Sequence, residues 1–292
     1  MWPIGAWDAP SRSWTAEAPE TLFRIVGPAT ACIHSPLPRR WPARNETTED
    51  VTLAKSLSEW VETDVRPVKN RPLKWISEEY FFRDPSRPTF SDPELFFSPA
   101  DGVVVYQREV EPGACIVEIK GKSYSLQGAM QDEHFDKRCL VIGIFMTMYD
   151  VHINRVPYSG FLSYKLLDPI STFNLPMLEV ERSLIEDLAV EHNHAHYLHG
   201  NERVLNRVYA PALEQHYYLL QIADYDVDCI MPFDLRQNAW AKQNRRFSQI
   251  RFGSQVDLII PLTGKHDFET LLEVGTHVEA GVDPLVRLTR KP

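Results

Sequence analysis

The dipeptide Gly253-Ser254 stands between two strand-like segments and is the first candidate for chemistry. A glycine tolerates a strained backbone and leaves its carbonyl carbon open to attack by the hydroxyl of the serine that follows. Such an attack would convert the peptide bond into an ester and start a cleavage of the chain. Gly-Ser pairs are also common in turns and β-bulges, so this pair needs partners before it indicates a reaction.

A serine hydroxyl is a weak nucleophile until a base removes its proton, and His152 is the best candidate for that base. It lies in the polar cluster Asp150 to Arg155, directly after the apolar run Leu140 to Met146. Polar groups at the end of a buried strand need mutual pairing or a task, and a purely structural histidine is the alternative. Asp101, in an Asp-Gly pair before an apolar strand, could orient the imidazole, although a tight turn would also explain it.

A histidine run, with His192, His194, His196 and His199, is the fourth candidate. If the segment were extended, the first three would share one face and could bind a metal ion. No cysteine or pair of carboxylates accompanies them, which a metal site of this kind would need. We therefore expect a solvated loop here and assign no metal ligand.

The elements that must position these residues are mainly short strands. After residue 95, segments rich in Val, Ile, Phe and Tyr alternate with Gly and Pro turns, as in a β-rich domain. Apolar spacings near three and four predict helices over residues 47–65, 72–81 and 177–189. The sequence thus predicts an α+β, β-rich fold of antiparallel sheets with N-terminal helices. The glycine spacing in residues 271–281 is similar to the closing hairpin of barrel-sandwich folds, an analogy of fold only.

Composition excludes several classes of function. The chain has 292 residues, 43% of them hydrophobic, and a formal net charge of -9, which disfavours nucleic acid as a partner. The apolar run Leu140–Met146 is far shorter than the roughly 20 residues of a membrane-spanning helix. The N-terminus lacks the pattern of a secretory signal. The four cysteines are far apart, which indicates reduced thiols. We expect a cytoplasmic protein with at most peripheral contact to the inner face of a membrane.

Residues 1–48 are rich in Pro and Trp and show neither helical nor strand periodicity, so we expect an irregular arm. Its tryptophans are Trp2, Trp7, Trp14 and Trp41. Packing against the domain is the favoured role for them, and contact with a membrane interface is the alternative. The remainder, residues 49–292, is predicted to be one catalytic domain.

Taken together, six segments resemble the phosphatidylserine decarboxylase family and keep that family's order. The match extends over residues 75–292. The segments are Glu79–Arg83, Ser98–Gly102 (S-P-A-D-G), Lys122–Leu126, Asp150–Pro157 (D-V-H-I-N-R-V-P), Asn201–Val204 (N-E-R-V) and Phe252–Ser254 at the family's self-cleavage site. The Asp150–Pro157 segment looks like the D-V-H-x-N-R-x-P form of the short bacterial branch.

The resemblance implies a proenzyme that cuts itself between Gly253 and Ser254 into residues 1–253 and 254–292. Ser254 would become a pyruvoyl group, the enzyme's own cofactor, whose ketone accepts a substrate amine and withdraws electrons as carbon dioxide leaves. His152 would serve as base in the cleavage and as proton donor in the decarboxylation, with Asp101 orienting it. The family also implies a homodimer.

Three features depart from the family's pattern. Arg155 stands where the better-known branch has a second histidine, so roles divided between two histidines cannot be assigned here. Gln255 replaces the usual threonine after the cleavage-site serine, which puts the rate of processing in doubt. The glycines that precede the cleavage strand are largely replaced, as in residues 243–247. The substrate pocket is therefore expected to differ.

Three functions follow from these patterns. The first is conversion of phosphatidylserine to phosphatidylethanolamine, which needs access to a lipid headgroup. The second keeps the chemistry but uses a free, for example aromatic, amino acid, as the acidic charge and the lack of an obvious membrane anchor suggest. The third is an uncleaved, non-catalytic homologue that acts as a binding protein. The intact Asp101, His152 and Gly253-Ser254 favour an enzyme over the third.

Overall fold

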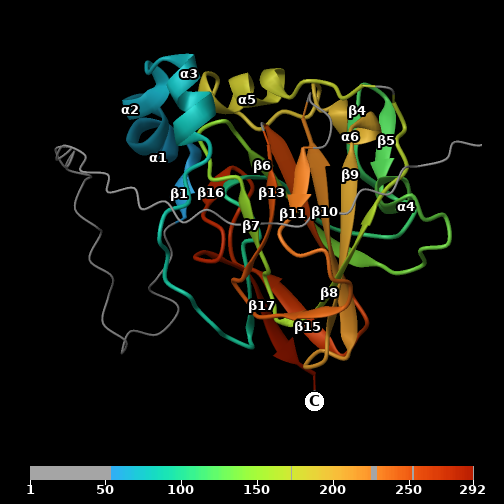
Figure 1. Cartoon of the computed structure of the whole chain (residues 1–292). Coiled ribbons are helices and arrows are strands. Elements are labelled where there is room, and N and C mark those ends of the chain that lie inside the picture. Colours follow the sequence, from blue (N-terminus) through green and yellow to red (C-terminus); the bar gives the residue numbers. More distant parts are fainter. Residues whose placement is uncertain (1–53, 172, 225–228, 252, 292) are drawn as a thin grey trace, which may run out of the picture. The chain divides into compact units, whose positions relative to one another are not determined.

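A nine-stranded antiparallel sheet forms the centre of the domain (Figure 1). The computed structural model describes residues 54–171, 173–224, 229–251 and 253–291. The chain divides into two units, residues 1–43 and 44–292, and every described residue belongs to the second. In spatial order the strands are β1 (Lys55–Ser56), β16 (Thr276–Val278), β3 (Gly102–Val110), β6 (Cys139–Met146), β14 (Ser254–Pro261), β10 (Gln215–Ala223), β9 (Arg203–Ala210), β8 (Gly160–Leu166) and β12 (Ala239–Ala241).

Three smaller antiparallel sheets complete the β-structure of the described residues. One contains β11 (Ile230–Pro232), β13 (Arg246–Ile250) and β7 (Ile153–Arg155), and a second contains β15 (His266–Thr270), β17 (Pro284–Arg290) and β2 (Leu95–Phe97). The third pairs β4 (Cys115–Ile119) with β5 (Lys122–Ser125). The α+β, β-rich fold class predicted from the sequence is confirmed.

The first helical segment runs from Leu57 to Lys69. It consists of α1 (Leu57–Trp60), a π-helical stretch (Val61–Val65) and α2 (Arg66–Lys69). Ser56 caps it, because its hydroxyl accepts a hydrogen bond from the Glu59 amide at 3.2 Å. The predicted start at residue 47 lies outside the described residues, and Lys55–Ser56 form a strand instead. The helix continues past its predicted end because Pro67 lies in the first turn of α2, where a missing N–H is tolerated.

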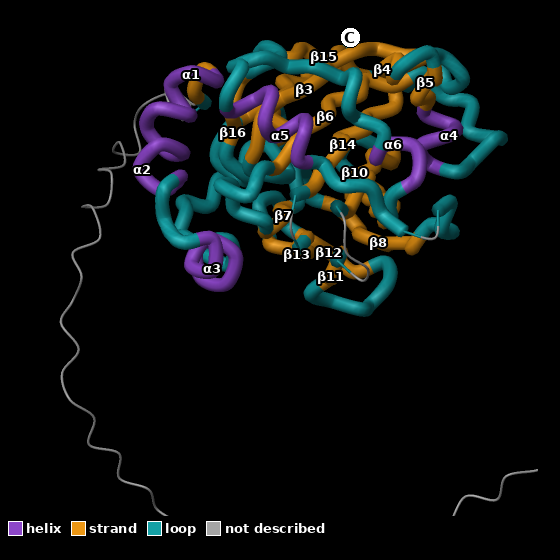
Figure 2. Tube along the Cα trace, turned by 90° about the horizontal axis from the view of Figure 1, so that it is seen from above, coloured by secondary structure: helices purple, strands orange, loops and turns teal. Residues whose placement is uncertain are grey.

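The other helices are short. The helix predicted over residues 72–81 is confirmed as α3 (Leu73–Trp75) followed by a π-helical stretch (Ile76–Tyr80). α5 (Leu178–Ile185) lies within the helix predicted over residues 177–189. α4 (Leu126–Met130) and α6 (Tyr197–Gly200) were not predicted. Viewed from above, α1–α3 lie at one side of the strands and α4 and α6 at the other (Figure 2).

β6 and β14 are neighbours in the middle of the sheet, and all eight residues of each are buried. Because side chains alternate along a strand, the two faces of β14 contact different hydrophobic clusters. Val256, Leu258 and Ile260 belong to one cluster, and Ile259 belongs to the other. Ser254 has the same parity as Val256, so its side chain points to the first face.

The opposite face of β14 carries a buried polar network. The Asp257 carboxylate accepts hydrogen bonds from the Tyr106 hydroxyl at 2.8 Å and from Gln255 Nε2 at 2.7 Å. Gly143 pairs with Asp257 across the sheet, and a Cβ on this glycine would lie 2.5 Å from the Tyr106 ring. Its missing side chain makes room for the tyrosine. Burial raises the pKa of Asp257 to about 6, although the hydrogen bonds from Gln255 and the tyrosines oppose this.

The structure also bears on the predictions for residues 271–281, the cysteines, membrane-spanning helices and the N-terminal arm. Residues 271–281, expected to resemble a closing hairpin, supply β16, which pairs with β1 and β3. The cysteines among the described residues, Cys115, Cys139 and Cys229, form no disulfide, and Cys32 lies outside that part. No helix in the described part of the chain is long and apolar enough to span a membrane. The predicted arm over residues 1–48 lies outside the described residues, so its boundary and role stay predictions.

Candidate active site

Ser254 is the first residue of β14 and is held from both sides. Its backbone pairs with Met146 at the end of β6 and with Ala223 at the end of β10. The side chain is fully buried, and its Oγ donates to the Met146 Sδ at 3.7 Å. The candidate nucleophile therefore lies in the interior of the domain, at the edge of a rigid three-strand frame.

Gly253 has no room for a side chain. A Cβ on this residue would lie 2.7 Å from Oδ2 of Asp224, closer than a real Cβ contact allows. Asp224 follows β10 directly, is itself buried, and its Oδ1 accepts a hydrogen bond from the Met177 amide at 3.0 Å. A buried carboxylate thus packs against the glycine of the candidate cleavage site, which explains why only glycine fits there.

His152 lies beside the segment that leads to the cleavage site. Its carbonyl accepts a hydrogen bond from the Ile250 amide at 3.1 Å, which extends the β7–β13 pairing by one residue. Two residues further on, Asn154 Nδ2 donates to the same Met146 sulfur as Ser254, at 3.6 Å. Because residues two apart on an extended strand point to one side, His152 faces the side of β7 that carries Met146 and Ser254.

The His152 imidazole is buried and neutral. Burial lowers its pKa to about 4, although the nearby Asp150 acts in the opposite direction. Its Nδ1 is 3.2 Å from the Asp150 carbonyl oxygen, so Nδ1 carries the proton and donates. Nε2 is buried and meets no hydrogen-bond partner among the described residues. The Phe81 ring packs against the imidazole at 4.0 Å. A neutral imidazole with an unengaged Nε2 can accept a proton.

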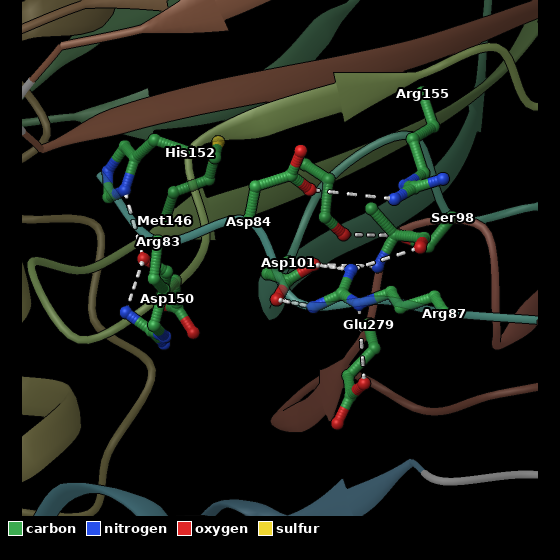
Figure 3. Close-up of polar contacts among 12 residues, drawn as sticks. Arg83, Asp84, Arg87, Ser98, Asp101, Met146, Asp150, His152, Arg155 and Glu279 are labelled. Carbon is green, nitrogen blue, oxygen red and sulfur yellow. Dashed lines mark hydrogen bonds and ion pairs between the residues drawn. The ribbon is translucent and has the colours of Figure 1, made fainter. Parts of the chain in front are cut away.

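Asp101 is part of a separate ion-pair group (Figure 3). Its two carboxylate oxygens accept hydrogen bonds from Arg87 at 2.6 and 2.5 Å, and the Ala280 amide donates to one of them at 2.8 Å. Burial alone would raise the pKa of Asp101, but the Arg87 charge and these hydrogen bonds lower it below its usual value. No hydrogen bond joins Asp101 to His152 in the described part of the chain. The orienting contact to His152 comes from the Asp150 carbonyl instead.

The position after Asp101 requires a glycine. Gly102 has a φ of +147°, and a Cβ there would lie 2.2 Å from the Phe145 carbonyl oxygen of β6. Gly102 therefore allows β3 to approach β6 closely at the point where Asp101 enters its ion pair. The Asp-Gly pair predicted as a strand start is confirmed as one.

An aspartate–histidine pair that the sequence did not predict joins the loop after β6 to β16. Asp150 Oδ1 lies 2.7 Å from Nε2 of His277 on β16, while its Oδ2 accepts hydrogen bonds from the Thr147 amide and hydroxyl, both at 2.8 Å. Trp60 of α1 stacks on the His277 ring at 4.6 Å. Asp150 thus holds His152 through its carbonyl and His277 through its carboxylate, which fixes the loop between β6 and β7.

Glu181 of α5 adds a third buried acid near the junction. Its Oε2 accepts a hydrogen bond from the Met148 amide at 3.3 Å. Burial raises the pKa of Glu181 to about 7, and the nearby Asp150 and Asp224 also act to raise it. α5 therefore contributes one acid that is partly protonated near neutral pH. Met177, which precedes this helix, has its Cβ 3.8 Å from the position of a Gly253 Cβ.

Ser254 contacts Met146, and Gly253 packs against Asp224. His152 pairs through its backbone with Ile250, three residues before Gly253, whereas Asp101 belongs to a separate ion-pair group. The histidine run forms a turn and α6 rather than a strand, so its residues do not share a strand face. No cluster able to bind a metal ion is found among the described residues. The sequence analysis did not identify three buried residues of this region, Asp224, Glu181 and Arg87. Asp224 carried a signal like that of the Asp150 cluster, namely a carboxylate directly after an apolar strand.

Comparison with known proteins agrees with this geometry. The model of the phosphatidylserine decarboxylase family matches residues 79–285, which include Asp101, His152 and Gly253-Ser254. The chain belongs to the phosphatidylserine decarboxylase family. It is therefore a decarboxylase, a carboxy-lyase, and the resemblance noted from six motifs is confirmed.

Two relatives show the extent of the similarity. A phosphatidylserine decarboxylase proenzyme of Pelagibacter ubique is 28% identical over 207 residues, which cover 69% of this chain and 75% of the relative. A protein of the same name from Symbiobacterium thermophilum is 29% identical over 212 residues, which cover 72% of this chain and 78% of the relative. Both names describe proenzymes.

Substitution of Gly253 by alanine tests the packing of the junction. The new Cβ would collide with the Asp224 carboxylate, so Gly253→Ala should slow any cleavage at residue 253 at least about tenfold. Gly128→Ala is a matched control, because its Cβ would lie at an ordinary 3.5 Å from the Ser125 hydroxyl. Fragment formation followed on denaturing gels gives both rates, and equal rates would contradict the described packing.

The buried His152 predicts a dependence of stability on pH. In the unfolded chain this histidine binds a proton near pH 6.5, whereas in the folded chain it stays neutral down to about pH 4. Unfolded molecules therefore bind more protons between these values, and stability falls as the pH is lowered through that range. The resulting loss between pH 7 and pH 5 is about 2 kcal/mol.

Urea unfolding of an uncleaved Ser254→Ala chain measures this loss. Adding His152→Gln should reduce the difference between pH 7 and pH 5 by about 2 kcal/mol. Adding His134→Gln at an exposed position should leave it unchanged. An unaltered pH dependence in the His152 variant would show that this histidine is not buried in the neutral form.

Proposed function

We propose that this chain is a pyruvoyl-dependent phosphatidylserine decarboxylase that matures by cutting itself between Gly253 and Ser254. The observation that carries the proposal is the surrounding of Ser254. The serine is fully buried at the start of β14, it follows a glycine that tolerates no Cβ, and a buried, neutral histidine pairs with the strand that leads to this glycine. The names of the relatives supply the lipid substrate.

In the proposed cleavage, the Ser254 Oγ attacks the Gly253 carbonyl carbon while Nε2 of His152 accepts the hydroxyl proton. The C–N bond then breaks, the proton returns to the Ser254 nitrogen, and an ester joins Gly253 to Oγ. Loss of the Ser254 α-proton expels the Gly253 carboxylate and leaves a dehydroalanine. Water converts this residue into a pyruvoyl group and ammonia, so no oxidant is required. The Nδ1 contact to Asp150 keeps Nε2 available as the proton acceptor.

The residues around Ser254 fit a pyruvoyl group. Its methyl carbon derives from the serine Cβ, and Met146 provides an apolar neighbour where the hydroxyl now lies. Once present, the group supplies an electron-withdrawing carbonyl for the loss of carbon dioxide from an α-amino acid. The unengaged Nε2 of His152 is the atom best placed to return a proton to the product. Arg87 keeps Asp101 ionised beside this region, which makes Asp101 a source of negative potential rather than of protons.

Two parts of the proposal rest on the family resemblance and the nature of the substrate. The enzyme is proposed to act as a homodimer in the cytoplasm, in peripheral contact with the inner face of the membrane. A lipid substrate requires such contact, because its headgroup remains at the bilayer surface. The tryptophans of residues 1–48, considered for this contact, lie outside the described residues.

Intact mass spectrometry of the purified chain tests self-cleavage. The 33.7 kDa protein should separate into fragments of about 29 and 4 kDa, in proportion to 253 and 39 residues. Ser254→Ala should remain uncut because it lacks the nucleophile. Ser248→Ala, which removes another buried hydroxyl on β13, should be cut like the wild type. A wild-type chain that stays intact, or a Ser254→Ala chain that is cut, would reject the proposed maturation.

Release of carbon dioxide from labelled substrates tests the substrate class. The cleaved protein should decarboxylate phosphatidylserine in vesicles at least about a hundredfold faster than free serine or tryptophan, a difference of about 3 kcal/mol in transition-state stabilisation. Ser254→Ala serves as the inactive control. Faster release from tryptophan than from vesicles would replace the lipid by a free amino acid while leaving the cleavage mechanism intact.

A further inference from the structure

A pocket of about 870 Å³ lies beside the edge strand β12. Its lining combines four cations with hydroxyl and amide groups and one tryptophan: Thr89, Ser91, Arg155, Ser159, Trp240, Lys242, Gln243, Asn244, Arg245 and Arg246. β13 begins at Arg246 in this pocket and ends at Ile250, three residues before Gly253. β13 thus spans about 13 Å between the pocket and the segment that leads to the cleavage site.

The cations around the pocket exceed the carboxylates that neutralise them. Asp84 pairs with Arg246 at 2.8 Å and with Arg155 at 4.0 Å, and Asp234 pairs with Arg245 at 3.5 Å. Burial lowers the pKa of Arg155; Arg87 and Arg246 act in the same direction, and Asp84 and Asp101 oppose them. Three of the four cations of the lining thus pair with two carboxylates, those of Asp84 and Asp234.

Lys242 increases this excess. It is exposed at the mouth of the pocket and forms no ion pair with any residue that the structure describes. The local positive charge contrasts with the formal net charge of -9 for the whole chain. An anionic partner is the complement of such a site.

Exposed aromatic side chains adjoin the pocket. Trp240 pairs across the sheet with Phe161 of β8, and the two rings meet edge to face at 5.1 Å. Phe161 in turn pairs with Tyr209 of β9, so a row of three aromatic rings crosses three strands. Their exposed fractions are 46%, 37% and 37%, which is high for residues of this size.

The loop after β11 adds two more apolar side chains. Phe233 and Leu235 are exposed, at 51% and 75%. Gln237 anchors this loop to β8 by hydrogen bonds with the Tyr164 amide at 2.9 Å and the Tyr164 carbonyl at 3.1 Å. We call the six residues Phe161, Phe233, Leu235, Trp240, Lys242 and Arg245 the Trp240 surface.

We propose that the Trp240 surface docks on an anionic phospholipid bilayer and brings the active site to its lipid substrate. Tryptophan and other aromatic side chains favour the interfacial region of a membrane, and lysine and arginine bind its anionic headgroups. The pocket would receive the phosphate of one headgroup. This inference rests on the proposed lipid substrate, but it concerns binding, which is measured apart from catalysis.

A second copy of the chain is the less suitable occupant. In a twofold dimer the same surface is present on both subunits, so Lys242 and Arg245 would lie close to the same cations of the second copy. The like charges would repel each other. The strands that form the aromatic row, β8, β9 and β12, contain no acidic residue that could compensate this repulsion. Charge complementarity therefore favours an anionic partner over self-association.

Co-sedimentation of the full chain with vesicles tests the docking surface. Phosphatidylglycerol mixed into phosphatidylcholine supplies the negative charge but no amine, so it cannot serve as substrate. The wild type and uncut Ser254→Ala should bind these vesicles alike, should bind pure phosphatidylcholine at least about tenfold more weakly, and should lose binding as salt is added.

Substitutions in the Trp240 surface localise the contact. Lys242→Glu combined with Arg245→Glu should weaken binding at least about tenfold, and Trp240→Ser should weaken it at high salt as well. Arg182→Glu on α5 is the matched control, because Arg182 is exposed and pairs with Glu179 at 3.1 Å much as Arg245 pairs with Asp234. Thermal unfolding shows whether each variant is folded.

The outcomes separate the two proposals. Unchanged binding by the folded charge-reversal variant, or equal binding to charged and neutral vesicles, would overturn the docking surface. A change of oligomeric state in Trp240→Ser without loss of vesicle binding would assign the surface to contacts between copies and overturn it too. Absence of cleavage or of carbon dioxide release would instead count against the proposed function, because binding of Ser254→Ala requires neither.

Discussion

The position of β14 between β6 and β10 is the constraint on which the candidate site depends. Its backbone is paired on both sides and its side chains are buried on both faces. Ser254 begins this strand, so the residue that follows the proposed cleavage site is fixed, while Gly253 lies just outside the paired region. A reaction that breaks the chain here leaves β14 anchored in the sheet by backbone hydrogen bonds and by the packing of Val256 and Leu258.

Burial also determines the electrostatics of the site. A buried group keeps its charge only where an opposite charge or hydrogen bonds stabilise the charged form. His152 receives only a carbonyl oxygen and stays neutral, which suits a base. Asp101 receives a bidentate arginine and stays ionised. Glu181, with one amide contact and two acids nearby, has its pKa raised to about 7. Three titratable groups in one region thus differ in charge because they differ in partners.

The sequence predicted the β-rich fold and the three short helical regions because these depend on local periodicity. It failed where tertiary contacts decide. Lys55 and Ser56, predicted as part of the first helix, form a strand because they pair with β16. The predicted partnership of Asp101 with His152 has no hydrogen bond, because Arg87 occupies both carboxylate oxygens. Arg87 lies after the helix predicted over residues 72–81, and nothing local in the sequence indicates its partner.

By itself the sequence determined the chemistry that this chain can attempt, since a glycine, a serine and a histidine in ordered motifs define a nucleophile, its target and a base. It also determined that two of these residues lie next to strands, through the apolar runs beside them. The tertiary structure decided which groups meet. It placed Asp224 against Gly253, and it placed His152 and His277 within hydrogen-bonding distance of Asp150. It also gathered Trp240, Phe161 and Lys242 at one edge. These contacts join residues far apart in the chain, so their energies arise only once the sheet has formed.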